Sequence, residues 1–95
     1  MQNENLVPVT LCCEQYKVEL SFIQSLHQYG FLHIVSVEAT PFISTDDLQI
    51  LEKLIRMYYE LDINLQGIEA ISFLLERVQN MQHEISYLKS KLNVY

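Results

Sequence analysis

The sequence predicts a mainly α-helical protein with a small β-hairpin, in which a winged helix-turn-helix precedes a long C-terminal helix. Two short amphipathic segments are followed by a β-rich stretch and a third amphipathic segment. An apolar heptad repeat then fills the last third of the chain. The expected organisation is a disordered polar tail at 1–5, a winged helix-turn-helix-like domain at 6–63 and the long helix at 64–95.

The N-terminal part is expected to contain a lead-in segment and a first helix. Residues 6–11 are apolar and favour β structure, but Pro8 confines them to a sheet edge or a lead-in. Thr10 is expected to N-cap the first helix, at about 11–17.

A second helix is expected at about 19–29. Gly30 follows it, at the position where a left-handed C-terminal cap is wanted. The apolar spacing predicts a buried face made of Phe22, Ile23 and Leu26.

A β-hairpin, the wing, is expected after the second helix. Its first strand is expected at 31–37, its turn at 38–41 and its return strand at Phe42 and Ile43. His27 on the second helix and His33 on the hairpin are interpreted as exposed polar side chains.

The third helix is expected to begin at Ser44, Thr45 or Asp46 and to end near Leu61, with acidic side chains in its first turn. Its apolar face is predicted to consist of Leu48, Leu51, Leu54, Ile55 and Tyr58.

The fourth helix is expected to begin at Leu65 and to run almost to the end of the chain. Asp62 or Asn64 should cap it, and Gly67 in its first turn indicates close packing. Its heptad seam has β-branched residues and Leu at a, and mainly Leu and Met at d, which favours self-association over packing back on the same domain. Both parallel and antiparallel pairs are workable. The predicted dimerisation residues are Ile71, Leu74, Val78, Met81, Ile85, Leu88 and Leu92, with Tyr95 at the last d position.

The distribution of charged residues argues against DNA binding. The net charge is −6, and residues 18–52 contain five acidic side chains but no Lys or Arg. DNA is held mainly by cations set against phosphates, so the pattern indicates a basic protein partner instead. The tentative partner-binding residues cluster around the third helix and the start of the fourth: Asp46, Asp47, Glu52, Glu60, Asp62 and Glu69.

No catalytic, cofactor or metal site is expected. The chain has no Gly-rich phosphate loop and no paired His ligands, and its only cysteines are the adjacent Cys12 and Cys13. Cys12 and Cys13 are interpreted as reduced structural thiols. With no signal peptide and no apolar run of spanning length, the expected location is the cytoplasm, with no membrane partner.

Several segments resemble MerR-type regulators. Residues 23–32, Ile-Gln-Ser-Leu-His-Gln-Tyr-Gly-Phe-Leu, are similar to the family's Leu-Arg-Tyr-Tyr-Glu-x-x-Gly-Leu run. Residues 42–48 resemble its wing end followed by Ser-x-x-Asp-Leu, and residues 60–68 its Glu-Leu-Gly-x-Ser-Leu-x-x-Ile. Gln24 replaces the arginine of the family's reading helix, and the wing arginine falls near Pro41. The arginines that the resemblance assigns to DNA contacts are therefore absent.

Residues 6–92 also resemble the CbpM family of chaperone modulators, which are short relatives of the MerR fold. The similarity is most specific at residues 59–68, 74–77 and 88–92. This resemblance implies a protein that binds the J-domain of a DnaJ-like (CbpA-type) co-chaperone and restrains its work with DnaK. With the heptad seam, the expected protein is a homodimer that needs no cofactor. A DNA-binding MerR-like transcription factor and an assembly adaptor that acts only through its coiled coil are the alternatives.

Overall fold

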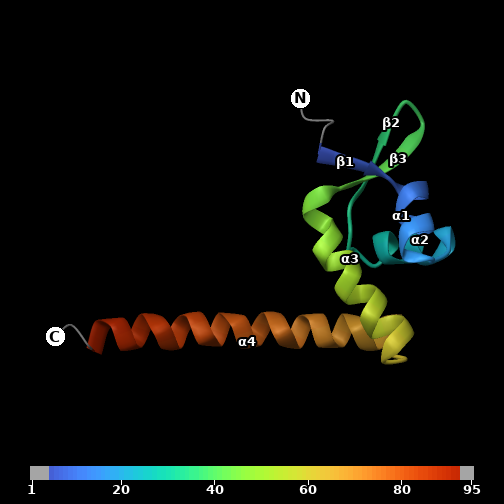
Figure 1. Ribbon diagram of the computed structural model, residues 1–95. Coiled ribbons are helices and arrows are strands. Elements are labelled where there is room, and N and C mark those ends of the chain that lie inside the picture. Colours follow the sequence, from blue (N-terminus) through green and yellow to red (C-terminus); the bar gives the residue numbers. More distant parts are fainter. Residues whose placement is uncertain (1–4, 93–95) are drawn as a thin grey trace. The chain divides into compact units, whose positions relative to one another are not determined.

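The computed structural model describes residues 5–92. They form a mostly helical chain with one small antiparallel sheet, whose strands lie in the order β1-β3-β2 (Figure 1). The chain divides into two compact units between Asp62 and Ile63. The sequence-based expectations for the tail at 1–4 and for Tyr95 lie outside the described residues.

The first unit opens with an edge strand and a helix. Strand β1 (Leu6–Pro8) pairs antiparallel with β3, and Pro8 ends it at the sheet edge, as expected. Helix α1 (Val9–Tyr16) follows directly. The prediction that Thr10 caps this helix was wrong: the cap position is Pro8, and no side chain caps it. Because Val9 is fully buried, the first turn is anchored by packing, and the helix begins two residues earlier than expected.

The turn from α1 into helix α2 (Leu20–Gln28) forms the helix-turn-helix. Lys17 takes a left-handed conformation with φ of 58°, and the Val18 N–H donates to the Cys13 carbonyl at 3.1 Å. Gly30 follows α2 in a left-handed conformation, with φ of 84°, as expected for a C-terminal cap. This conformation lets the Phe31 N–H donate to the Leu26 carbonyl at 3.0 Å. The expected buried face of α2 is confirmed for Phe22, Ile23 and Leu26.

Strands β2 (Ile34–Val37) and β3 (Thr40–Ser44) form the hairpin. The turn is shorter than expected and consists of Glu38 and Ala39, with φ of 53° and 67°. Two positive φ values give a turn whose twist matches that of the paired strands. Pro41, expected in the turn, is a strand residue opposite Ser36.

The third helical segment is continuous from the end of β3 to Leu61. Ser44 caps it, because its Oγ accepts the Asp46 N–H at 3.2 Å. The segment comprises the 3-10 turn η2 (Thr45–Asp47), helix α3 (Leu48–Ile55) and the π-helical turn η3 (Arg56–Glu60). The π turn closes with the Leu61 N–H donating to the Arg56 carbonyl at 3.1 Å.

The core of the first unit draws on all of its helices and on the sheet. No buried polar or charged side chain lies within it among the described residues. Phe22 contacts the rings of both Tyr58 and Tyr59, with centroid distances of 4.8 and 5.1 Å. The buried apolar side chains of this unit are Val9, Cys12, Val18, Phe22, Ile23, Leu26, Leu32, Ile43, Leu51 and Leu54.

The second unit consists of helix α4 (Leu65–Leu92) and its capping segment. Asn64, one of the two expected caps, accepts the Gly67 N–H at 2.7 Å through Oδ1. Asp62 instead takes a left-handed conformation, with φ of 57°. The close packing expected at Gly67 is local: a Cβ there would lie 2.8 Å from the Ile63 side chain and 3.1 Å from the Asn64 cap oxygen.

Candidate protein-binding surfaces

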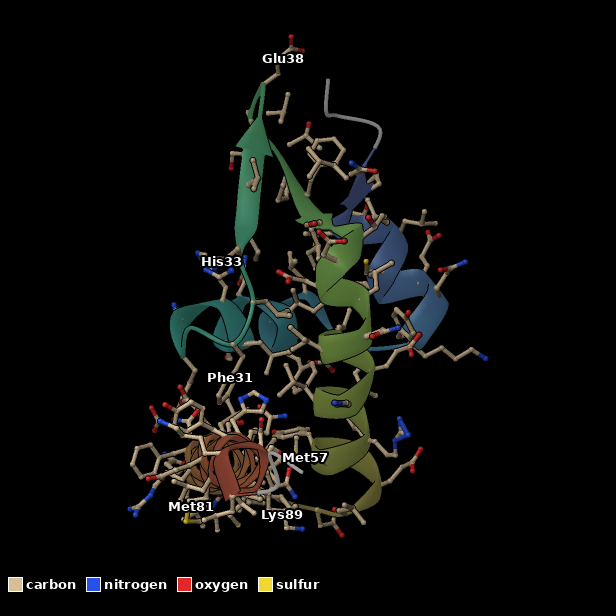
Figure 2. The ribbon with its side chains drawn as sticks, turned by 90° about the vertical axis from the view of Figure 1, so that its left-hand side faces the viewer. Phe31, His33, Glu38, Met57, Met81 and Lys89 are labelled. Atoms are coloured by element: carbon tan, nitrogen blue, oxygen red, sulfur yellow. The ribbon has the colours of Figure 1, made fainter. Side chains whose placement is uncertain are left out.

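Helix α2 and the β2–β3 hairpin present a surface without cations. The exposed side chains of α2 include Ser21, Gln24 and Gln28, which are polar and uncharged. Glu38 lies at the tip of the hairpin, so the only charge at the turn is negative (Figure 2). Neither element carries a Lys or Arg. This surface can offer hydrogen bonds, but it has no fixed cation to set against a phosphate.

The His27 ring joins the end of α2 to the start of the hairpin. Its Nδ1 lies 3.2 Å from the Leu32 carbonyl oxygen and 3.3 Å from the Ile34 amide nitrogen, which donates to it. His27 is exposed, as expected, but its ring also contacts two backbone groups. The sequence holds no signal for this contact, because both partners are backbone groups brought there by the chain reversal at Gly30.

His33 precedes strand β2 and is tied to the third helical segment. Its backbone N–H donates to the Asp47 carboxylate at 3.3 Å, and its Nδ1 lies 3.9 Å from the same Oδ2. The imidazole is 84% exposed, as the sequence suggested, whereas the Asp47 side chain is only 17% exposed. Asp47 thus has a structural role in holding the hairpin entrance.

The predicted acidic residues differ in what their carboxylates do. Glu52 accepts a hydrogen bond of 2.8 Å from the Tyr16 hydroxyl, which links α3 to α1. Asp46 and Glu60 are exposed, at opposite ends of the third helical segment. The helical rise over the 14 residues between them separates them by about 20 Å. Glu69 belongs to the other unit. Within the first unit these acids therefore spread along a ridge and do not converge on one point.

The net charge is concentrated in the first unit. Residues 1–62 carry nine acidic and three basic side chains, a net charge of −6, whereas residues 63–95 carry three of each. The acidity is thus a property of the helix-turn-helix unit, and α4 is neutral as a whole. A partner attracted by charge would meet the first unit.

The predicted heptad seam is exposed along α4. Its exposed fractions run from 42% at Val78 to 72% at Leu92. Figure 2 labels Met81, which belongs to this seam, and Lys89, which lies on α4 beside it. An apolar stripe of this length on one helix is the kind of surface that a second helix covers. Residues Leu74, Val78, Met81, Ile85, Leu88 and Leu92 form its exposed part.

Two further aromatic side chains on α4 lie outside the seam and were not predicted from the sequence. Phe73 and Tyr87 are 57% and 60% exposed. Arg77 lies over the Phe73 ring at 6.0 Å from its centroid, and Lys91 over the Tyr87 ring at 5.5 Å. Each cation follows its aromatic partner by four residues, the spacing that makes neighbours on a helix surface, so the pairs could have been found from spacing alone.

The two cysteines are free thiols with little reactivity. Cys12 is buried in the core and Cys13 is partly buried. Burial raises the pKa of both thiols, and the neighbouring Cys13 raises that of Cys12 further. Both groups therefore stay protonated at neutral pH, which makes them poor nucleophiles and poor metal ligands. Across residues 5–92 no three His, Cys, Asp or Glu side chains come together as a metal site.

None of the helices between residues 5 and 92 is both long and apolar enough to cross a membrane.

Comparison with known families decides the assignment. A family described as MerR HTH family regulatory protein matches residues 7–90. The chain belongs to the MerR HTH family. No curated protein and no solved structure matches it significantly. The match spans the helix-turn-helix, the hairpin and most of α4, so this MerR-family chain carries the family pattern through both units.

Proposed function

We propose that this MerR-family protein is a non-catalytic modulator that binds the J-domain of a DnaJ-like, CbpA-type co-chaperone and restrains its activity with DnaK. In this proposal the β2–β3 hairpin is the wing of a winged helix-turn-helix, and the protein acts as a homodimer without cofactor. The chain's resemblance to the CbpM family names the partner. The structural support comes from charge.

The proposal depends on one observation: α2 and the β2–β3 hairpin, the elements with which a winged helix-turn-helix would contact DNA, carry no Lys or Arg. Helix α2 and the hairpin form continuous elements with no Lys or Arg, and Glu38 occupies the hairpin tip. A phosphate backbone would be repelled there. A basic polypeptide surface would be attracted, because complementary charge speeds encounter and selects the partner.

Helix α4 supplies the dimer in this proposal. Its exposed seam runs over nearly three heptads, from Leu74 to Leu92, and pairing with a second copy would remove the apolar side chains from water. Two copies would then present two acidic units, which doubles the negative surface without placing charge in the seam.

The test is direct binding to an isolated J-domain. Calorimetric titration of the full chain at low ionic strength should show saturable binding that weakens as salt is added, because exposed charges are screened over about 10 Å at 0.1 M salt. The same addition should lower the stimulation of DnaK ATPase by the co-chaperone. Absence of binding at low salt, with no NMR shifts in the J-domain, would reject the proposal.

One observation favours a DNA-binding regulator as the second candidate. Gln24 and Gln28 lie on the exposed side of α2, and glutamine can hydrogen-bond adenine in the major groove. Lys17, Lys53 and Arg56 flank this stretch in the sequence and could supply a few phosphate contacts. A gel-shift assay at low salt separates the two functions: tight, salt-sensitive binding of an oligonucleotide would favour this second candidate.

A further inference from the structure

One ring nitrogen of His27, Nδ1, contacts two backbone groups. One of these groups is a hydrogen-bond donor and the other is an acceptor. The Ile34 N–H donates to Nδ1 at 3.3 Å, which requires a lone pair there. The Leu32 carbonyl lies 3.2 Å from the same atom and can only accept, which requires a proton there. A neutral imidazole carries one or the other at Nδ1, never both.

The Ile34 N–H depends on His27 because of its place in the sheet. The two-residue turn makes Val37 and Thr40 a hydrogen-bonded pair, and pairs alternate along an antiparallel ladder. Ile34, opposite Ile43, is therefore in a non-hydrogen-bonded pair, and its N–H points away from β3. Since β2 is an edge strand, His27 provides its acceptor within the protein.

We propose that the α2–hairpin joint is a pH-sensitive switch, in which protonation of His27 exchanges its bond to the Ile34 N–H for one to the Leu32 carbonyl. With Nδ1 unprotonated, the ring holds the first residue of β2. Once the ring is protonated, Nδ1–H donates to Leu32, and the Ile34 N–H faces another N–H. The first residue of the hairpin is then released from α2.

The charged groups around the joint act in different directions. His27 lies in the last turn of α2. On the other side, His33 lies 3.9 Å from the Asp47 carboxylate of η2, so a protonated His33 strengthens the hold on the hairpin entrance. Acidification therefore releases Ile34 from His27 while the Asp47 contact still holds His33. Histidine is the side chain that changes charge between about pH 5 and 8.

The test is NMR on the full chain across this pH range. The ¹⁵N shifts of the His27 ring should show Nδ1 unprotonated at the alkaline end. Protection of the Ile34 amide against hydrogen exchange, corrected for the intrinsic pH dependence, should fall about fivefold as His27 protonates. In His27→Gln this change should disappear, whereas His33→Gln should retain it. His83 on α4 reports the titration of an exposed histidine in the same sample.

Two results would overturn the switch. One is a neutral His27 that carries its proton on Nδ1, because the Ile34 bond could not then exist. The other is an Ile34 response of equal size in His27→Gln, which would place its cause elsewhere. The outcome is independent of which partner the protein binds.

Discussion

The Tyr16 hydroxyl donates a hydrogen bond of 2.8 Å to the Glu52 carboxylate, which ties the end of α1 to the middle of α3. The two residues are 36 positions apart in the sequence, and both belong to the first unit. The bond also occupies one of the carboxylates predicted to bind a partner. Glu52 therefore contributes to stability as well as to surface charge.

We expect Tyr16→Phe and Glu52→Ala each to lower the free energy of unfolding by about 0.5 kcal/mol, because each removes a hydrogen bond to a charged acceptor at an exposed site that water only partly replaces. A double-mutant cycle in urea should show that the two losses are not additive. Additive losses would mean that the hydroxyl and the carboxylate are uncoupled in solution.

Alkaline pH should destabilise the fold. Burial, and then the bond to Glu52, raises the pKa of Tyr16 above its ordinary value of 10.0. Burial likewise raises the pKa of Cys12 above 9.0. A raised pKa in the folded state gives stability that is complete below the unfolded pKa and is lost as pH rises through the folded pKa. The urea concentration at the midpoint of unfolding should therefore decrease as the pH is raised above about 9. In Tyr16→Phe this decrease should be smaller above about pH 10. A midpoint that is constant up to about pH 11 would contradict this assignment.

Local sequence signals predicted the elements better than the contacts between them. The second helix was placed to within a residue at each end, because Phe22, Ile23 and Leu26 repeat at helical spacing and Gly30 supplies the left-handed cap. The start of α1 was misplaced, because Thr10 has the chemistry of a cap whereas burial of Val9 decides where the helix begins.

The candidate surfaces divide in the same way. The heptad seam and the missing cations are properties of the sequence itself, and α4 and α2 carry them as expected. The joint at His27 could not be predicted, because its partners are backbone atoms positioned by the fold. Nor does the sequence reveal that Asp47 is engaged by the His33 N–H while Asp46 stays exposed.

Replacing Gly67 with Ala should destabilise α4 at its start, although Ala is the better helix former by about 1 kcal/mol. The new Cβ would lie 2.8 Å from Ile63 Cγ2 and 3.1 Å from the Asn64 oxygen that caps the helix. We expect a net loss of up to about 1 kcal/mol, because loss of an N-cap costs up to about 2 kcal/mol, which exceeds the propensity gained, and the close contact with Ile63 adds to the cost. Ser86→Ala, at an exposed position of α4, is the control and should be neutral or slightly stabilising. A higher thermal unfolding temperature for Gly67→Ala would contradict this, because it would mean that the Asn64 and Ile63 side chains move aside without loss of stability.

Charges placed in the heptad seam should abolish self-association. Val78→Glu with Ile85→Glu would bury two carboxylates at a positions, which costs far more than pairing gains. Analytical ultracentrifugation should show a dimer for the native chain and a monomer for this variant. The control, Gln79→Glu with Ser86→Glu, adds the same charge outside the seam and should remain dimeric. A native chain that is monomeric at every concentration tested would remove the seam as a dimer interface.

Removing the charge of two exposed carboxylates of the first unit should weaken partner binding more than an equal change of charge on α4. Asp46→Asn with Glu60→Gln changes the net charge by two units without touching the bonds of Asp47 or Glu52. We expect J-domain affinity to fall about five- to tenfold at low salt, mainly through slower association, because exposed charges at an interface act on the encounter rate. Gln79→Lys with His83→Lys makes the same net change on exposed positions of α4 and should alter affinity less than about twofold. Equal losses in both variants would show that the partner responds to overall charge, and that the acidic ridge of the first unit is not its binding surface.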